Sequence, residues 1–325
     1  MKSVISIVFY LFFINASSQN YKLIDEKVKN YPKFHQIETL VLRVDTSFKT
    51  KEEKARAYYT WISYNITYDL NRYHTIEGPN LEVTFNSERL NKCIENHNRS
   101  KLANRIFKTR RALCMGFSTL FQELCLRSNI EVKIIEGITK VSVDDLEHSN
   151  YIKNHAWNAV KIKNKWQLID LSWSSGYENT NTGKWVTAFN DFYFFTNPEE
   201  LITTHFPADS KFQLLEKSLN FESFFQQPVV YNKYFESGLK ISDYQKGLIN
   251  VSKKDKKIRL SFKNRKKDTT IYYKFDDDTY LKELQLIKKE GSNNFVAALK
   301  YKSRTSEVLS LYYQNEKILD FKIEK

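Results

Sequence analysis

The period at which apolar residues recur changes along this chain, and that change constrains its architecture more than any other feature. Up to about residue 130, apolar residues recur at the spacing of a helix face. After Leu215 they alternate with polar residues in short runs, of which Ile258, Leu260 and Phe262 form the clearest. Because helices come first and an antiparallel sheet follows, the pattern predicts an α+β protein.

The clearest helix start lies at Thr50. Glu53 follows three residues later, and such a pair forms a capping box in which each side chain bonds the backbone N–H of the other residue. The apolar stripe that follows includes Tyr58 and Ile62 and ends near Asn65. We expect a helix here that serves as scaffold.

Short alternating runs continue to the C-terminus, separated by polar, turn-like clusters. The runs are Ile258 to Phe262, Thr270 to Phe275, Phe295 to Tyr301, Val308 to Tyr313 and Ile318 to Ile323. About six to eight strands predict an antiparallel, immunoglobulin-like β-sandwich over residues 236–325. No catalytic cluster appears in this region, so we expect it to pack, bind a partner or present substrate.

The first residues have the features of a secretory signal peptide. Lys2 precedes an apolar run, Val4 to Ile14, that is too short to span a bilayer, and Ala16 begins a run of small residues. We expect residues 1–18 to be cleaved and the mature protein to be exported, to a periplasmic or extracellular location. An uncleaved anchor is the alternative, and no later stretch approaches the ~20 apolar residues of a transmembrane helix.

Cys114 stands at the start of a second predicted helix. Phe117, Leu120, Phe121 and Leu124 follow it at helical spacing. The unpaired N–H groups and the positive end of the helix dipole favour a thiolate there. An imidazolium neighbour can lower such a thiol pKa to roughly 3.5 to 7.5.

His155 and Asp170 lie on two runs that a short polar segment joins, which predicts a β-hairpin. If residues 163–164 form a two-residue turn, His155 falls opposite Ser172 and Asp170 becomes its diagonal neighbour. These residues then share one face of the sheet, at a separation of about 7 to 8 Å that an imidazole and a carboxylate can close. A turn longer or shorter by one residue would place His155 and Asp170 on opposite faces.

Each of these three residues also has an ordinary structural explanation. Cys114 would be a small core residue, His155 a packed and satisfied side chain, and Asp170 a turn former. A cysteine at a helix start, with a histidine and an aspartate on one face of a following hairpin, instead indicates a catalytic triad. In it Cys114 is the nucleophile, His155 the general base and then acid, and Asp170 orients His155.

Five stretches carry a resemblance to a known family. They are Cys114 to Ser118, His155 to Val160, Trp166 to Asp170, Lys54 to Asp69 and Phe192 to Pro207. They resemble the transglutaminase-like superfamily, and within it they are similar to the kyphoscoliosis peptidase group. The resemblance covers roughly residues 35 to 230, and Ala112 stands where many relatives carry Gly.

The resemblance implies a transglutaminase-like, papain-like cysteine-enzyme core over residues 19–235, ahead of the sandwich. It implies that the triad attacks amide or peptide carbonyls of protein or peptide substrates through a thioester acyl-enzyme. The backbone N–H of Cys114 and a side chain that the sequence does not identify would hold the oxyanion. We favour water as second substrate, hence a peptidase or amidase, over a lysine amine, hence a cross-linking enzyme. The alternative is a non-enzymatic binding or scaffold module of the cell envelope that retains the fold.

The sequence predicts neither a metal site nor a cofactor. It contains no Cys-x-x-Cys and no His-Glu-x-x-His motif, and its 6 histidines are scattered. Cys114 and Cys125 are about 16 Å apart along the predicted helix and cannot form a disulfide. We expect Cys93 and Cys125 to be buried thiols. A disulfide between them is the alternative.

The chain is basic, with a formal net charge of +13. Much of the excess lies between Lys253 and Lys267, where basic residues alternate with Ile258, Leu260 and Phe262. This alternation indicates a core face with a solvated basic face opposite, or a surface for an anionic cell envelope or acidic partner. We expect no nucleic-acid partner, because an exported chain rarely meets one.

Overall fold

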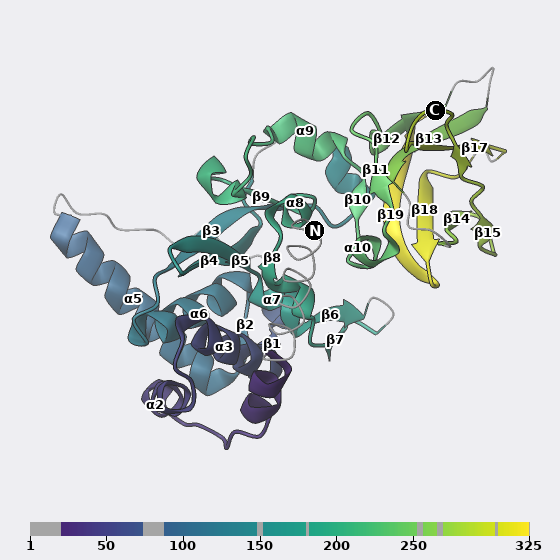
Figure 1. The fold of residues 1–325 in the computed structure, drawn as a ribbon. Coiled ribbons are helices and arrows are strands. Elements are labelled where there is room, and N and C mark those ends of the chain that lie inside the picture. Colours follow the sequence, from purple (N-terminus) through teal and green to yellow (C-terminus); the bar gives the residue numbers. More distant parts are fainter. Residues whose placement is uncertain are drawn as a thin grey trace, which may run out of the picture. The chain divides into compact units, whose positions relative to one another are not determined.

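A computed structural model gives the fold of the protein (Figure 1). It describes residues 21–73, 88–147, 152–179, 182–251, 256–264, 269–302 and 305–324. These form two compact units: the first takes the chain up to Glu136 with His155–Thr196, and the second takes Gly137–Asn154 with the chain from Asn197 onward. The predicted signal peptide lies outside the described residues, and the predicted domain boundary after residue 235 stays a prediction.

The first unit contains most of the helices. They are a helix over residues 21–29, α2 (Ile37–Ser47), α3 (Lys51–Asn65), α4 (Leu70–Tyr73), α5 (Glu88–Thr109), α6 (Cys114–Arg127), α7 (Leu171–Ser175) and the short η2 (Asp191–Tyr193). The predicted capping box is present, because the Glu53 N–H donates to the Thr50 hydroxyl at 3.1 Å and the Thr50 N–H donates to the Glu53 carboxylate at 2.8 Å. No described helix is long and apolar enough to cross a membrane.

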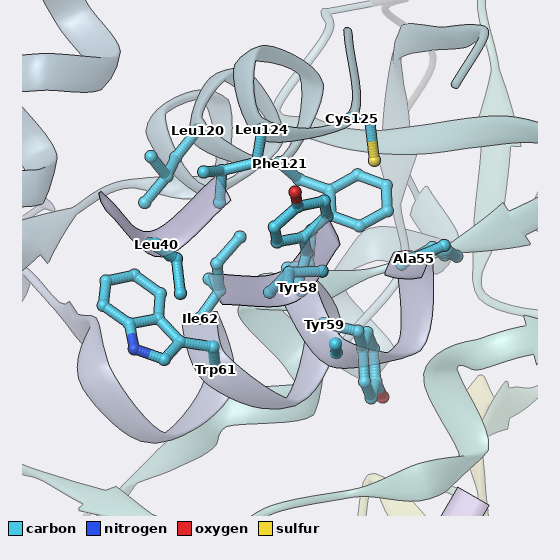
Figure 2. Packing of buried hydrophobic residues seen from close by; sticks show 14 of the residues in the cluster. Leu40, Ala55, Tyr58, Tyr59, Trp61, Ile62, Leu120, Phe121, Leu124 and Cys125 are labelled. Atoms are coloured by element: carbon cyan, nitrogen blue, oxygen red, sulfur yellow. The ribbon is translucent and has the colours of Figure 1, made fainter. Parts of the chain in front are cut away.

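Helices α3 and α6 pack together in the core of this unit. Figure 2 shows their side chains facing each other, and Tyr58, Ile62, Phe121 and Leu124 have no exposed surface. Every position of α3 from Ala55 to Ser63 is buried, which explains its weak division into apolar and polar faces. Since α6 is fixed along its length by this packing, its first residue, Cys114, is fixed too.

The strands of the first unit lie beside these helices. The main sheet has the order β8 (Phe194–Thr196), β5 (Lys165–Ile169), β4 (His155–Ile162), β3 (Val132–Thr139). Two smaller pairs are β1 (Thr67–Tyr68) with β2 (Arg111–Ala112), and β6 (Gly176–Asn179) with β7 (Lys184–Thr187). The predicted two-residue turn is confirmed: Ile162 pairs with Lys165, and Lys163 and Asn164 both have positive φ, as a type I′ hairpin turn requires.

The second unit begins with short elements and ends in strands. The short elements are η1 (Val143–Glu147), α8 (Pro198–Leu201), β9 (His205–Pro207), η3 (Ser210–Gln213), α9 (Phe221–Gln226) and α10 (Lys233–Ser237). The last residues of β3 pair with β9 within this unit, with Ile138 opposite Phe206. Phe224 and Phe225 of α9 pack in one buried cluster with Ile138 and Phe206.

Two sheets make up the rest of this unit. One has the order β10 (Val229–Val230), β19 (Glu316–Glu324), β18 (Val308–Tyr313), β14 (Tyr272–Phe275), β15 (Lys282–Glu283), with β12 (Leu248–Asn250) also on β19. The other has the order β11 (Lys240–Ile241), β13 (Lys257–Asn264), β17 (Phe295–Lys300), β16 (Ile287–Lys288). Their apolar side chains share one core, so the predicted α+β fold with a C-terminal β-sandwich is confirmed. Only β12 departs from antiparallel pairing among the described strands of these sheets.

Strand β13 has the predicted division into two faces. Ile258, Leu260 and Phe262 are buried, whereas Lys257, Arg259 and Lys263 are exposed. The basic residues therefore lie on the solvated face of a strand whose other face is core.

Candidate active site

Cys114 is the first residue of α6, as its sequence predicted. Leu113, the residue before the helix, is extended and offers no side-chain cap to the first turn. Its carbonyl accepts the N–H groups of Gly116 at 2.8 Å and Phe117 at 3.0 Å, which closes the turn around the thiol. The sulfur therefore sits at the positive end of the helix.

Gly116 lets this first turn approach its neighbours closely. A Cβ atom at Gly116 would lie 2.8 Å from the Ile106 side chain and 2.9 Å from the Cβ of Ala112. Both distances are shorter than real Cβ contacts, so a larger residue would push the start of α6 out of place. Ala112 is thus part of the surface that holds the turn beginning at Cys114.

His155 is the first residue of β4 and is buried. Its ring contacts two tryptophans, with centroid distances of 6.0 Å to Trp157 and 5.7 Å to Trp173. Its Nε2 atom is 2.5 Å from Oδ2 of Asp170. Packing and this hydrogen bond together set the orientation of the imidazole.

Asp170 lies one residue beyond the end of β5, so the prediction that it belongs to the second strand of the hairpin is wrong. Asp170 is instead the N-cap of α7, and its Oδ1 accepts the N–H of Trp173 and the hydroxyl of Ser172, both at 2.9 Å. Its side chain has no exposed surface. Ser172 therefore does not lie opposite His155 but helps to hold the carboxylate that His155 contacts.

The charges of these side chains reinforce one another. Burial acts to lower the pKa of His155, but the charge and hydrogen bond of Asp170, with a contribution from Cys114, raise it to about 10. Burial acts to raise the pKa of the Cys114 thiol, but its hydrogen bond with His155 and the positive charge of that imidazole lower the pKa below its ordinary value. The environment thus favours a thiolate beside an imidazolium.

The structure brings His155 and Asp170 into contact, and His155 lowers the pKa of Cys114. Other residues that the sequence did not single out lie near this site. Tyr68 of β1 pairs with Ala112 of β2, two residues before Cys114, and its ring stacks on Phe117 of α6 at 6.2 Å between centroids. The Tyr68 ring stacks on Trp185 at 5.2 Å between centroids. Among the described residues, the buried indole N–H of Trp185 has no hydrogen-bond acceptor. Tyr68 lies in one of the five similar stretches, but nothing in its local sequence indicates that it lies near the start of α6.

The other two cysteines lie in different environments. Cys125 is buried, as expected, and burial raises its pKa well above the ordinary value. Cys93 is exposed, so the expectation that it is buried is wrong. Both are free thiols in this structure.

Residues 38–171 match the family model described as "Transglutaminase-like superfamily". Cys114, His155 and Asp170 all lie within this range. The family match thus covers the helix that begins at Cys114, the hairpin that carries His155, and Asp170 just after it.

Curated proteins from several organisms are similar to this chain. It is 26% identical over 211 residues to kyphoscoliosis peptidase of Homo sapiens, which covers 65% of this chain and 28% of that protein. It is 32% identical over 134 residues to cytokinesis protein 3 of Schizosaccharomyces pombe, which covers 41% of this chain and 15% of that protein. The chain thus spans less than a third of the length of either relative.

Proposed function

We propose that this chain, whose residues 38–171 match the model of the transglutaminase-like superfamily, is a cysteine enzyme acting on amide or peptide carbonyls. Cys114 is the nucleophile, His155 the general base and acid, and Asp170 the residue that orients His155. The observation that carries the proposal is the 2.5 Å contact between His155 and Asp170 beside a thiol whose pKa is lowered.

The proposed reaction has two stages. The Cys114 thiolate forms a bond to the carbonyl carbon, and the electron pair of the C=O bond moves to oxygen. The intermediate collapses to a thioester as His155 gives its proton to the departing amine. A water or an amine, deprotonated by His155, then attacks the thioester and releases Cys114.

Asp170 contributes by fixing the imidazole and stabilising its positive charge. Because Asp170 binds Nε2 of His155, Nδ1 of the same ring is left to exchange the proton with Cys114 and the substrate. Because the carboxylate is also held by Ser172 and Trp173, the ring has a defined orientation throughout the reaction. General acid and base catalysis of this kind contributes about 10²- to 10⁴-fold to a rate.

We favour hydrolysis over amine transfer, because two similar proteins, from Homo sapiens and Mus musculus, are named as peptidases. A second candidate is a binding or scaffold module without activity. The name of cytokinesis protein 3 denotes a cellular process and no reaction, which supports keeping that candidate. The hydrogen bond between His155 and Asp170 supports an enzyme over a binding module.

Export and an anionic surface partner also remain proposals. The apolar run and small residues of positions 1–18 support export, and the exposed basic face of β13 supports an anionic partner such as a cell-envelope surface. Sequencing the N-terminus of protein recovered from its native cells would decide the first, since a mature chain beginning near Gln19 is expected.

A peptide library offered with and without a primary amine donor tests the activity. Mass spectrometry distinguishes hydrolysed from aminated products. The Cys114→Ala variant is expected to form neither product, whereas Cys93→Ser, which removes an exposed thiol, is expected to match the parent protein. Product formation by Cys114→Ala would contradict the role of Cys114 as the nucleophile. No product from the parent protein or from Cys93→Ser would favour the binding module.

A further inference from the structure

The sheet made of β11, β13, β17 and β16 differs in charge from the other sheet of the second unit. Its described strands contain basic residues and no acidic one: Lys240, Lys257, Arg259, Lys263, Lys288 and Lys300. We call it the basic sheet. The described strands of the other sheet contain four lysines and four carboxylates. There, Lys317 binds Asp320 and Lys322 binds Glu147 of η1, both at 2.9 Å.

Three of the cations lie together at one end of the outer face of the basic sheet. Lys257 of β13 is directly opposite Lys300 of β17, and Arg259 follows two positions later on the same face. All three are exposed, and the residues that alternate with them face the core. Lys263 lies at the other end of β13, where it binds Asp243. Like charges directly opposite each other destabilise a sheet, so an anion bound over Lys257 and Lys300 would reduce their repulsion.

Exposed apolar side chains adjoin these cations on the same face. Ile287 of β16 lies opposite Val296 of β17, and their side chains are 67% and 38% exposed. Val296 is four positions from Lys300 along β17, so both point to the outer face at a separation of about 13 Å. The outer face is therefore basic at one end and apolar at the other.

We propose that this outer face docks onto an anionic lipid membrane. The three cations lie at the lipid phosphates, and Ile287 with Val296 enters the boundary between headgroups and acyl chains. A membrane offers negative charge next to an apolar phase, which matches both ends of the face, whereas an acidic polymer matches only the basic end. Each Lys or Arg near an anionic surface strengthens binding about fivefold, and the apolar contact adds the second signal that stable docking requires.

This inference rests on the anionic partner of the proposed function and not on the cysteine chemistry of the first unit. The peptide library tests that chemistry separately, so the failure of either proposal is recognised by itself.

Sedimentation of the full chain with lipid vesicles tests the docking face. Vesicles of phosphatidylcholine alone are compared with vesicles that contain phosphatidylcholine and phosphatidylglycerol in equal parts. The apolar run Val4 to Ile14 is common to every variant, so the neutral vesicles measure its contribution. We expect the parent protein to bind the anionic vesicles more tightly, and this preference to shrink as added salt screens the charges.

Two pairs of lysine substitutions separate this face from the net charge of the chain. Lys257→Gln with Lys300→Gln should weaken binding to anionic vesicles about ten- to thirtyfold. The matched control, Lys101→Gln with Lys108→Gln, removes the same charge from exposed positions of α5 and should bind like the parent protein. Lys257→Arg with Lys300→Arg keeps the charge and should also bind like the parent.

Ile287→Ser tests the apolar end of the face. Because the side chain is largely exposed, the substitution should leave the thermal melt unchanged. Binding to anionic vesicles should fall about tenfold, since the serine side chain gains little on leaving water.

Three results would overturn the inference. Equal weakening by both pairs of Lys→Gln substitutions would show that binding follows the net charge and not this face. Binding of soluble polyglutamate as tight as that of anionic vesicles, with no effect of Ile287→Ser on either, would indicate an acidic partner in place of a membrane. Binding of the parent protein to anionic vesicles no tighter than to neutral ones would show that the face does not dock on such a membrane.

Discussion

The Nε2 atom of His155 lies 2.5 Å from Oδ2 of Asp170, and neither side chain is accessible to more than a trace of solvent. The same carboxylate caps helix α7, so one residue both starts a helix and orients the imidazole. A buried carboxylate is costly unless it is fully hydrogen-bonded. The cap therefore stabilises the charge that raises the pKa of His155.

We expect Asp170→Asn to separate these two roles. An asparagine oxygen can still accept the Trp173 N–H and the Ser172 hydroxyl, so the fold should persist, but the negative charge beside His155 is lost. The pKa of His155 should fall and that of Cys114 should rise. Steady-state kinetics should then show a loss of about 10²- to 10⁴-fold.

Ser172→Ala is the matched control for that variant. It removes one hydrogen bond to Asp170, worth about 1 kcal/mol, and keeps the charge. Its activity should fall far less than that of Asp170→Asn. Equal losses in the two variants would show that orientation of the carboxylate matters and that its charge does not.

Alkylation of Cys114 should follow a lower pKa than that of an ordinary thiol. Because His155 lowers the thiol pKa, the pH dependence of iodoacetamide labelling should have its midpoint below the ~8.5 of free cysteine. His155→Ala should raise the midpoint. Peptide mapping measures both, with exposed Cys93 as the internal reference and buried Cys125 as an unreactive one. A Cys114 profile that coincides with that of Cys93 would count against an activated thiolate.

Lys140 should make the stability of the second unit depend on pH. Its ammonium is fully buried and donates to the carbonyls of Phe224 and Gln227, both at 2.8 Å. Burial lowers its pKa to about 7, whereas the unfolded chain has about 10.4. Between these values the unfolded chain binds a proton that the folded chain does not. The free energy of unfolding should therefore rise with pH from about 7 to 10, by at most about 1.4 kcal/mol per pH unit.

Lys140→Met tests this assignment. The variant has no titrating side chain at this position. The unfolding free energy of the parent minus that of the variant should therefore rise with pH across the same window. Urea denaturation at several pH values from about 6 to 10 gives the two curves. Parallel curves would show that Lys140 keeps its proton in the folded protein.

The parts of the site that the sequence predicted are local. The hairpin register follows from a two-residue turn, and the helix start at Cys114 follows from apolar spacing over a few residues. The end of β5 was missed, because Leu171 and Trp173 continue an alternating pattern. An aspartate three residues before Trp173 is nevertheless the N-cap signal that marks α7.

The missed parts depend on contacts between distant segments. Tyr68 lies beside the residues that precede Cys114 because β1 pairs in parallel with β2, more than forty positions later in the chain. No periodicity marks a two-residue strand. Likewise, residues 137–154 group with the later part of the chain because the end of β3 pairs with β9. The local sequence of β3 does not indicate this pairing with a distant strand.

Truncation tests the predicted boundary between residues 235 and 236. Within the second unit, Phe224 and Phe225 cover Ile138 and Phe206, so a chain ending at residue 220 exposes that cluster. A chain ending at Phe235 keeps it. We expect the longer chain to be more soluble and to retain rapid alkylation of Cys114, because all three proposed catalytic residues precede it.

The longer truncated chain should still carry one exposed apolar patch. Val230 pairs with Leu319 of β19 and lies with Tyr234 in the sandwich core, so removing the sandwich uncovers both side chains. Replacing them, as Val230→Thr with Tyr234→Ser, should raise soluble yield further without changing the alkylation rate. Soluble yield, thermal melts and limited proteolysis measure the outcome. If both truncated chains aggregate alike and proteolysis of the full chain releases no fragment, the two parts share one core and the predicted division into domains is wrong.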